Sequence, residues 1–212
     1  MAIGRAGAPT DFVSAGTLAF DAPARADPRS LYRVYSMTKP VTGVAAMILI
    51  EEGKLRLDQP LADILPAFAN MSVIDGGDVA KTRPAAGPIL IRHLLTHTAG
   101  FSYAIFGDRP LAKLYRQHGL RPGERPARSG PGEEPPVRTL DEFGKRLAPL
   151  PLDFDPGTKW QYSVAADLTG LVIQTVSGMS FWDFLRTRLF EPLGMVDTDF
   201  MVPKSKLARL TS

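Results

Sequence analysis

The clearest amphipathic pattern in the chain covers residues 41–52. Apolar side chains recur there at helical spacing, and Gly53 follows as a stop signal. Pro40 is compatible with the first turn of a helix, because the first backbone N–H groups have no intrahelical acceptor. The pattern therefore predicts a helix that begins near Ser36 and ends before Gly53.

Similar signals predict four further helices, over residues 89–97, 139–147, 165–176 and 180–190. Thr139 and Glu142 have the spacing of a capping box. Ser163 and Ser180 are the candidate N-caps of the last two helices. Residues 57–68, with a proline near each end, predict one or two short helical turns.

Strand signals concentrate near the N-terminus. Residues 12–20 predict a strand or hairpin arm, and residues 31–35 predict a short extended segment that leads into Ser36. Such strands need partners to pair their edges, and the rest of the chain offers few. We therefore expect two parts: N-terminal strands with the first long helix in residues 1–55, and a helical subdomain in residues 56–212.

Composition narrows the class of protein. The 212 residues are 44% hydrophobic and 22% charged, which is ordinary for a globular protein with a sizeable core. No apolar run is long enough for a membrane helix, and the N-terminus lacks the apolar core of a signal peptide. We expect no membrane partner and a cytoplasmic location. The absence of cysteine excludes disulfides and thiol chemistry.

The net charge of +3 raises the question of nucleic-acid binding. The basic residues are scattered, except for a cluster of four arginines at positions 116, 121, 125 and 128. The cluster begins just before the Gly- and Pro-rich residues 118–138 and continues within them. No aromatic residues are interleaved with the arginines. We interpret it as a solvated loop and expect no nucleic-acid partner.

Ser36 and Lys39 are three residues apart at the start of the first long helix. Residues at this spacing share a helix face, so the serine Oγ and the lysine Nζ can approach each other. The positive end of the helix dipole lies at the same place and favours a developing negative charge. This arrangement is typical of a serine nucleophile activated by a lysine. The alternative is an N-capping serine beside a solvated lysine, because the motif alone is short.

A second constellation covers residues 155–163, in which a tight Asp-Pro-Gly turn leads to Tyr162 just before a predicted helix. A free phenol and a free lysine amine are both protonated at neutral pH. Placed together, the ammonium stabilises a phenolate, and burial favours a neutral amine. Protons in such a pair belong to the pair, so neither Tyr162 nor Lys39 alone is named as the base. The alternative is a half-buried tyrosine at a helix edge.

His93 and His97 share one helix face, but the chain has no metalloprotease glutamate after the first of them and no cysteine. We expect structural roles, with imidazoles bonded to backbone carbonyls, and no metal or other cofactor.

Taken together, these residues resemble the serine β-lactamase-related family, which includes class C β-lactamases, and among its members most closely the family VIII carboxylesterases. Five segments carry the resemblance in family order, at residues 31–40, 51–58, 91–100, 156–163 and 190–195. The resemblance implies an α/β fold, with an antiparallel sheet flanked by helices and a mostly helical subdomain. It also implies that Ser36 is the acyl-accepting nucleophile, that Lys39 is its proton partner and that Tyr162 is the general base and acid. The backbone N–H of Ser36 would then form half of an oxyanion hole.

Three departures from the family pattern bear on function. Val164 stands where class C β-lactamases have an asparagine that contacts the substrate amide, which favours esters over β-lactams. The chain starts late in the N-terminal strand pair. It also lacks the family's C-terminal strands with their third motif, so it resembles a truncated member.

We therefore expect a serine carboxylesterase that acts on small-molecule esters. The alternatives are a β-lactamase or D-amino-acid peptidase, and an inactive or binding-only fragment. A complementary C-terminal segment and a homo-oligomer are the partners to consider.

Overall fold

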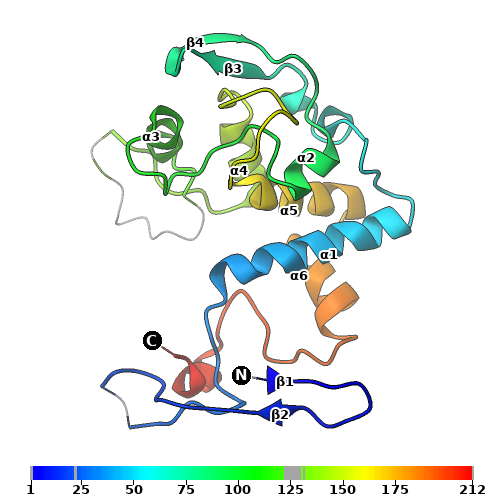
Figure 1. The fold of residues 1–212 in the computed structure, drawn as a ribbon, viewed down its shortest axis with the longest axis vertical. Coiled ribbons are helices and arrows are strands. Elements are labelled where there is room, and N and C mark those ends of the chain that lie inside the picture. The colour runs from blue at the N-terminus through cyan, green and yellow to red at the C-terminus, as the bar shows by residue number, and fades with distance from the viewer. Residues whose placement is uncertain (1, 22, 122–129, 131, 212) are drawn as a thin grey trace. The chain divides into compact units, whose positions relative to one another are not determined.

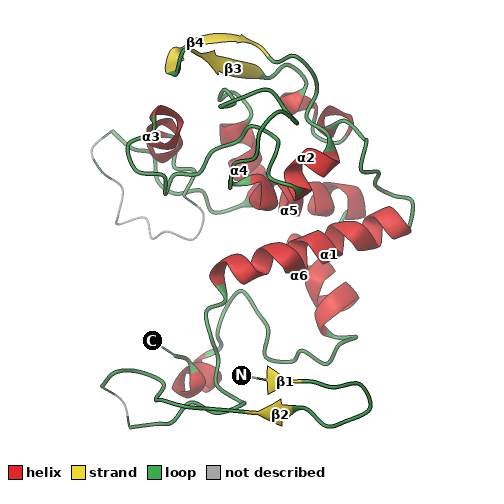
Figure 2. Ribbon diagram, in the orientation of Figure 1, coloured by secondary structure: helices red, strands yellow, loops and turns green. Residues whose placement is uncertain are grey.

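The computed structural model describes residues 2–21, 23–121, 130 and 132–211, and the chain divides into two compact units. Unit 1 comprises Met1–Thr38 and Phe190–Ser212, and unit 2 comprises Lys39–Leu189. The sequence patterns suggested a boundary near residue 55. In the structure the chain passes from unit 1 to unit 2 after Thr38 and returns to unit 1 at Phe190. Figure 1 follows the chain through both units, and Figure 2 marks its helices and strands.

Unit 1 has little regular structure. Strands β1 (Ala2–Ile3) and β2 (Asp11–Phe12) form an antiparallel pair. The predicted strand over residues 12–20 is wrong beyond Phe12. Gly16 has a φ of +84°, outside the extended region, and Thr17 forms only an isolated bridge with Arg25. The backbone therefore turns where the hydrophobic pattern suggested a continuous strand.

The N-terminal and C-terminal segments of unit 1 are joined at Leu31. Leu31 forms an isolated parallel bridge with Leu210. Its N–H donates to the Arg209 carbonyl at 2.7 Å, and its carbonyl accepts from the Thr211 N–H at 2.9 Å. The 3₁₀ helix η6 (Lys204–Arg209) lies directly before this junction. The extended segment predicted near Leu31 is thus reduced to this single bridge.

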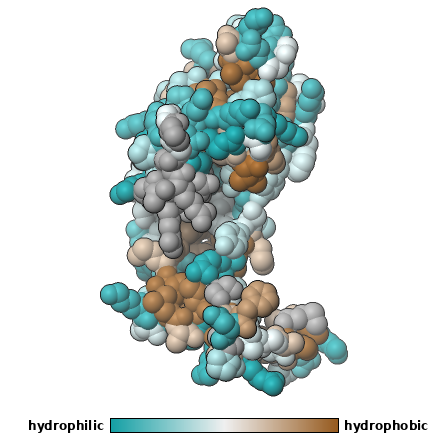
Figure 3. All heavy atoms as spheres, turned by 90° about the vertical axis from the view of Figure 1, so that its left-hand side faces the viewer, coloured by the Kyte–Doolittle hydropathy of each residue, from teal (hydrophilic) through white to brown (hydrophobic). Residues whose placement is uncertain are grey.

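Many apolar side chains of unit 1 remain exposed. Figure 3 shows brown, apolar side chains on its surface. The exposed residues include Phe12, Val13, Phe20, Tyr32, Val34, Phe200 and Met201. An apolar surface of this extent is typical of a face that another segment covers.

Helix α1 (Thr38–Glu51) confirms the helix predicted from the first pattern. It follows a short 3₁₀ turn, η1 (Tyr35–Met37), and Gly53 with a φ of +69° ends it as expected. Ala45, Ala46 and Leu49 of α1 are fully buried. Two further 3₁₀ turns, η2 (Leu61–Asp63) and η3 (Pro66–Phe68), match the short turns predicted there.

Helix α5 (Ala165–Ser177) is the centre of unit 2 and packs against three other helices. These are α2 (Ile91–Leu95), α4 (Leu140–Leu147) and α6 (Phe181–Leu185), which a π-helical turn, η5 (Arg186–Phe190), extends. Gly144 of α4 lies so close to α5 that an added Cβ would come within 2.4 Å of Leu171. The sequence patterns predict all three of these neighbouring helices, α2, α4 and α6. The caps Thr139 and Ser180 are also confirmed, because each side chain accepts the backbone N–H three residues later.

A β-hairpin and a helix of unit 2 were not predicted. Strands β3 (Ser72–Asp75) and β4 (Asp78–Pro84) form an antiparallel hairpin, and both glycines of its Gly76-Gly77 turn have positive φ. Helix α3 (Pro110–Gln117) buries Leu111, Ala112 and Tyr115.

The arginine cluster is not a solvated loop where the structure describes it. Arg121 is 5% exposed and forms an ion pair with Glu133 at 2.8 Å. Arg116 donates to the Ala104 carbonyl at 2.7 Å. Both side chains therefore bind other parts of the chain near α3. Positions 125 and 128 lie outside the described residues.

Candidate active site around Lys39 and Tyr162

Lys39 and Tyr162 are brought together within unit 2. Lys39 is the second residue of α1, and its Nζ lies 4.8 Å from the centroid of the Tyr162 ring. The same Nζ lies 5.6 Å from the ring centroid of Tyr103. Ammonium groups at these distances are attracted to the faces of aromatic rings. A cation and two phenols therefore share one small region.

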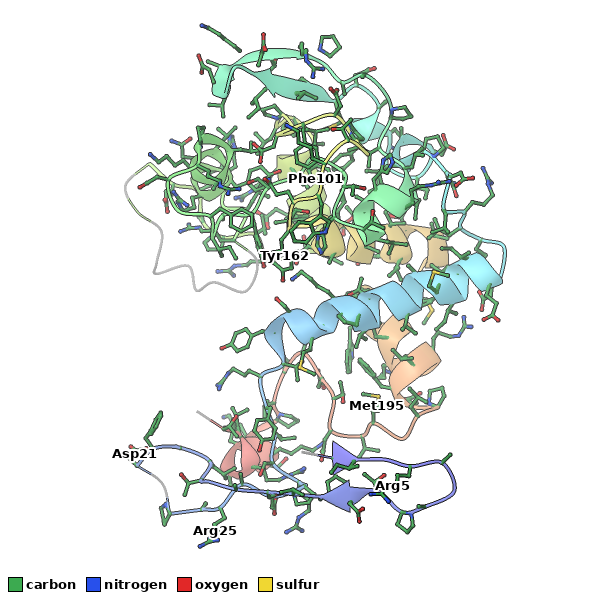
Figure 4. The ribbon with its side chains drawn as sticks, viewed as in Figure 1. Arg5, Asp21, Arg25, Phe101, Tyr162 and Met195 are labelled. Carbon is green, nitrogen blue, oxygen red and sulfur yellow. The ribbon has the colours of Figure 1, made fainter. Side chains whose placement is uncertain are left out.

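The segment before Tyr162 is fixed by the Asp155-Pro-Gly turn. The Arg83 guanidinium donates twice to the Asp155 carboxylate, at 3.0 and 2.6 Å, and the Ala86 N–H donates at 2.8 Å. These hydrogen bonds lower the pKa of Asp155 to about 2, and the largest contribution comes from Arg83. Gly157 donates its N–H to the Thr98 carbonyl at 2.8 Å. Tyr162 thus follows an anchored turn and lies just before α5, as Figure 4 shows.

The two histidines act as hydrogen-bond acceptors. His93 Nδ1 accepts the Leu90 N–H at 3.1 Å, and His97 Nδ1 accepts the Ser163 N–H at 3.3 Å. The expectation that the imidazoles bond to backbone carbonyls is therefore wrong, since both rings bind backbone donors. Among the described residues, no group of histidine and acidic side chains has the arrangement of a metal site.

Ser163 is not the N-cap residue of α5. The cap position is Val164, whose side chain is fully buried. Ser163 lies one residue earlier, and its Oγ accepts the Ala165 N–H at 3.3 Å. The serine thus still binds a backbone donor of the first helical turn.

Tyr103 belongs to the site but was not found from the sequence. Burial is the main cause that raises the pKa of Tyr103 to about 12, and the charge of Asp167 and the neighbouring Tyr162 add to it. Its ring centroid lies 5.8 Å from that of Tyr162. This phenol is therefore protonated at neutral pH.

Asp167 is the second residue that the sequence did not single out. It lies in the first turn of α5, and its Oδ2 is buried without a hydrogen-bond partner among the described residues. Burial raises the pKa of Asp167, and the positive charge of Lys39 opposes this effect. Its position in the first turn of a helix five residues after Tyr162 was the available sequence signal.

Ser36 lies in unit 1, in the exposed turn η1. The residue before it, Tyr35, has a φ of +42°, which is unusual for a bulky side chain. Among the described non-glycine residues, positive φ occurs only at Tyr35 and at His97. One of these precedes the predicted nucleophile, and the other contacts Tyr162. Strained backbone of this kind clusters at functional sites.

Comparison with known proteins identifies the family. The sequence model of the Beta-lactamase family matches residues 1–212. Esterase EstB of Burkholderia gladioli is 34% identical over 172 residues, which are 81% of this chain and 39% of EstB. Lovastatin esterase of Penicillium rubens is 34% identical over 168 residues, which are 78% of this chain and 38% of that enzyme.

Among solved structures, EstCE1, described as a hydrolase with promiscuous acyltransferase activity, superposes with a TM-score of 0.74. Its sequence identity is 29%, and the match covers 93% of this chain and 46% of EstCE1. The chain belongs to the Beta-lactamase family and has its α/β fold. It spans about two fifths of the length of the curated relatives that it matches.

The family includes esterases.

Among the described residues, no helix has the length and apolar character needed to cross a membrane.

Proposed function

We propose that this protein is a serine hydrolase that cleaves carboxylic esters through an acyl-enzyme on Ser36. The observation that carries the proposal is the pairing of Lys39 with Tyr162, in a chain whose Ser36 is three residues before that lysine. A serine hydroxyl needs a partner that takes its proton, and a lysine–tyrosine pair that has lost one proton, as phenolate beside ammonium or as phenol beside neutral amine, supplies one. Membership of a family that includes esterases supports the same chemistry.

The reaction has two steps in this proposal. Ser36 Oγ attacks the ester carbonyl carbon, and its proton passes to the Lys39–Tyr162 pair. The pair then protonates the leaving alcohol as the bond between the acyl carbon and the alkoxy oxygen breaks. Water attacks the acyl-enzyme in the second step, gives its proton to the same pair and releases the acid, while Ser36 regains its proton.

Val164 supports esters as the substrate class. Its side chain is fully buried and apolar. The resemblance to class C β-lactamases implies that those enzymes carry an asparagine at this position. A buried valine offers no hydrogen bond to a substrate amide. Without a hydrogen-bond partner for the substrate amide, the site no longer favours amide substrates. An ester substrate does not need this hydrogen bond.

The test uses two substrates and two serine variants. We expect a higher kcat/KM for p-nitrophenyl butyrate than for nitrocefin, and no ester hydrolysis above background in Ser36→Ala. Ser102→Ala is the matched control, because Ser102 Oγ is buried and has no hydrogen-bond partner among the described residues. A higher kcat/KM for nitrocefin would assign the protein to the β-lactamases. Retained esterase activity in Ser36→Ala would exclude Ser36 as nucleophile.

A further inference from the structure

His97 binds the backbone on both sides of Tyr162. The Gln161 N–H donates to the His97 carbonyl at 2.9 Å, and the Ser163 N–H donates to His97 Nδ1 at 3.3 Å. One residue thus binds the backbone N–H of the residue before the tyrosine and that of the residue after it. The direction in which Tyr162 leaves the backbone is set by these two contacts.

The imidazole also packs against the aromatic rings of this segment. Its centroid lies 5.0 Å from that of Tyr162, with a tilt of 37° between the planes. It lies 6.4 Å from the ring of Trp160, in an edge-to-face arrangement. Ring pairs at such distances stabilise each other beyond the effect of burial alone. His97 therefore contacts both the backbone around Tyr162 and the phenol ring itself.

His97 adopts this position in an unfavourable backbone conformation. Its φ is +55°, a region that favours glycine, asparagine and aspartate. Such a conformation persists only where surrounding contacts determine it. The turn is fixed on its far side by the Thr98 N–H, which donates to the His93 carbonyl at 2.9 Å.

The hydrogen bonds define which nitrogen of His97 carries the proton. Ser163 Oγ accepts from the Ala165 N–H, so its own proton is available for His97 Nδ1, which lies 3.2 Å away. Nδ1 therefore faces two donors, the hydroxyl and the N–H of Ser163. Only an imidazole that is unprotonated at Nδ1 satisfies both, which places the proton of the neutral ring on Nε2.

The surroundings of His97 favour this neutral form. Burial lowers the pKa of His97 below its usual value of 6.5, and the positive charge of Lys39 in α1 lowers it further. Tyr162, just before α5, is a further titratable side chain in contact with the imidazole. At neutral pH the acceptor at Nδ1 is thus maintained.

We propose that His97 is the positioning residue for Tyr162 and releases it when the imidazole is protonated. This inference rests on the proposed function, in which Tyr162 carries protons for Ser36. A proton on Nδ1 would point at the Ser163 N–H and break that backbone contact, whereas the Ser163 hydroxyl can rotate and accept the new proton. Activity would then fall at acid pH through displacement of Tyr162, in addition to any titration of the Lys39–Tyr162 pair.

Two substitutions separate the acceptor from the ring. His97→Asn keeps an acceptor near the position of Nδ1, tolerates positive φ and does not titrate. His97→Phe keeps a ring but leaves the Ser163 donors without their acceptor. We expect His97→Phe to lower kcat by about 100-fold with less change in KM, since small displacements of catalytic groups have effects of this size. We expect His97→Asn to stay within about 10-fold of wild type.

The matched control is His93→Asn. His93 also accepts a backbone N–H at Nδ1 and is also partly buried, but its ring lies against Gly157. We expect this variant to leave kcat and the acid limb of the pH profile unchanged.

The deciding measurement is the pH titration of the ¹³Cζ resonance of Tyr162 in ¹³C-tyrosine-labelled protein, assigned by its loss in Tyr162→Phe. We expect an inflection below pH 6.5 in wild type, its loss in His97→Asn, and a shifted or broadened resonance in His97→Phe. A Tyr162 resonance that is identical in all three proteins would overturn the proposal. If the resonance behaves as expected but Ser36 is not acylated, the proposed function fails while the positioning of Tyr162 by His97 stands.

Discussion

The ammonium of Lys39 lies 4.8 Å from the ring centroid of Tyr162, although the two residues are more than 120 positions apart in the chain. Helix α1 supplies the lysine, and the segment between the Asp155-Pro-Gly turn and α5 supplies the tyrosine. The helices of unit 2 therefore form one site from two distant motifs.

Removal of either group from the pair should reduce catalysis. We expect Tyr162→Phe to lower kcat by about 10²–10⁴, the usual contribution of general acid–base catalysis. Lys39→Ala should have at least the same effect, because it removes the charge that favours a phenolate. Tyr103→Phe is the control, since this phenol stays protonated at neutral pH, and its kcat should remain within about fivefold. Near wild-type kcat in Tyr162→Phe would show that Tyr162 is structural.

Asp167 predicts a stability that depends on pH. Burial raises the pKa of Asp167 in the folded protein, so the unfolded chain loses this proton first as the pH rises. Between the two pKa values the folded state binds more protons, and its stability falls as the pH rises through this window. We expect Asp167→Asn to have a higher Tm than wild type at pH 7, with the difference shrinking towards pH 4. A difference in Tm that is constant with pH would contradict this account. The measurement is thermal unfolding followed by circular dichroism.

Gly100 ends the turn that begins at His97, and it has no room for a side chain. Its φ is +91°, and an added Cβ would lie 2.3 Å from the Phe154 carbonyl oxygen. We expect Gly100→Ala to lower the free energy of unfolding by more than 2 kcal/mol, roughly the combined effect of backbone strain and displaced backbone.

Gly178→Ala is the matched control for this prediction. Gly178 also has positive φ, at +69°, but within the described part of the chain no atom beyond its own neighbouring backbone lies within 4 Å of an added Cβ. Its cost should be about 1 kcal/mol, the usual penalty of alanine in this conformation. Equal losses in the two variants, measured by urea unfolding, would show that the contact with Phe154 is unimportant.

The exposed apolar side chains of unit 1 predict that a further segment covers them. We propose the C-terminal strands of the family as this segment, because the curated relatives are more than twice as long as the matched region. We expect residues 1–212 alone to unfold broadly and to have about 10²–10³ lower kcat, since the resemblance to the family implies that the second half of the oxyanion hole lies in that segment. Addition of the segment, in the same chain or as a second one, should sharpen unfolding and raise kcat. A cooperative transition with full activity in the short form would contradict this prediction.

The sequence predicted the elements in which local signals agree with tertiary packing. Helices α1 and α5 have apolar faces at helical spacing and are followed by Gly53 and Gly178, both of positive φ. The β3–β4 hairpin was missed, although its Gly76-Gly77 turn was the available signal. The strand expected over residues 12–20 failed because hydrophobic periodicity does not reveal a turn at Gly16.

The site was predictable only in part for a different reason. Lys39 and Tyr162 belong to short motifs with a chemical rationale, whereas Tyr103 and Asp167 meet them only through the packing of α5 and the preceding segments. The role of His97 depends on which nitrogen binds Ser163, and that depends on the folded backbone. No spacing rule in the sequence contains this information.

The central claim is that Ser36 becomes acylated, and covalent labelling tests it most directly. The protein is treated with a fluorophosphonate probe and digested, and the modified peptide is sequenced by mass spectrometry. We expect a single adduct on Ser36, strongly reduced in Lys39→Ala and absent in Ser36→Ala. An adduct on Ser102 or Ser163, or labelling that persists in Ser36→Ala, would contradict the account.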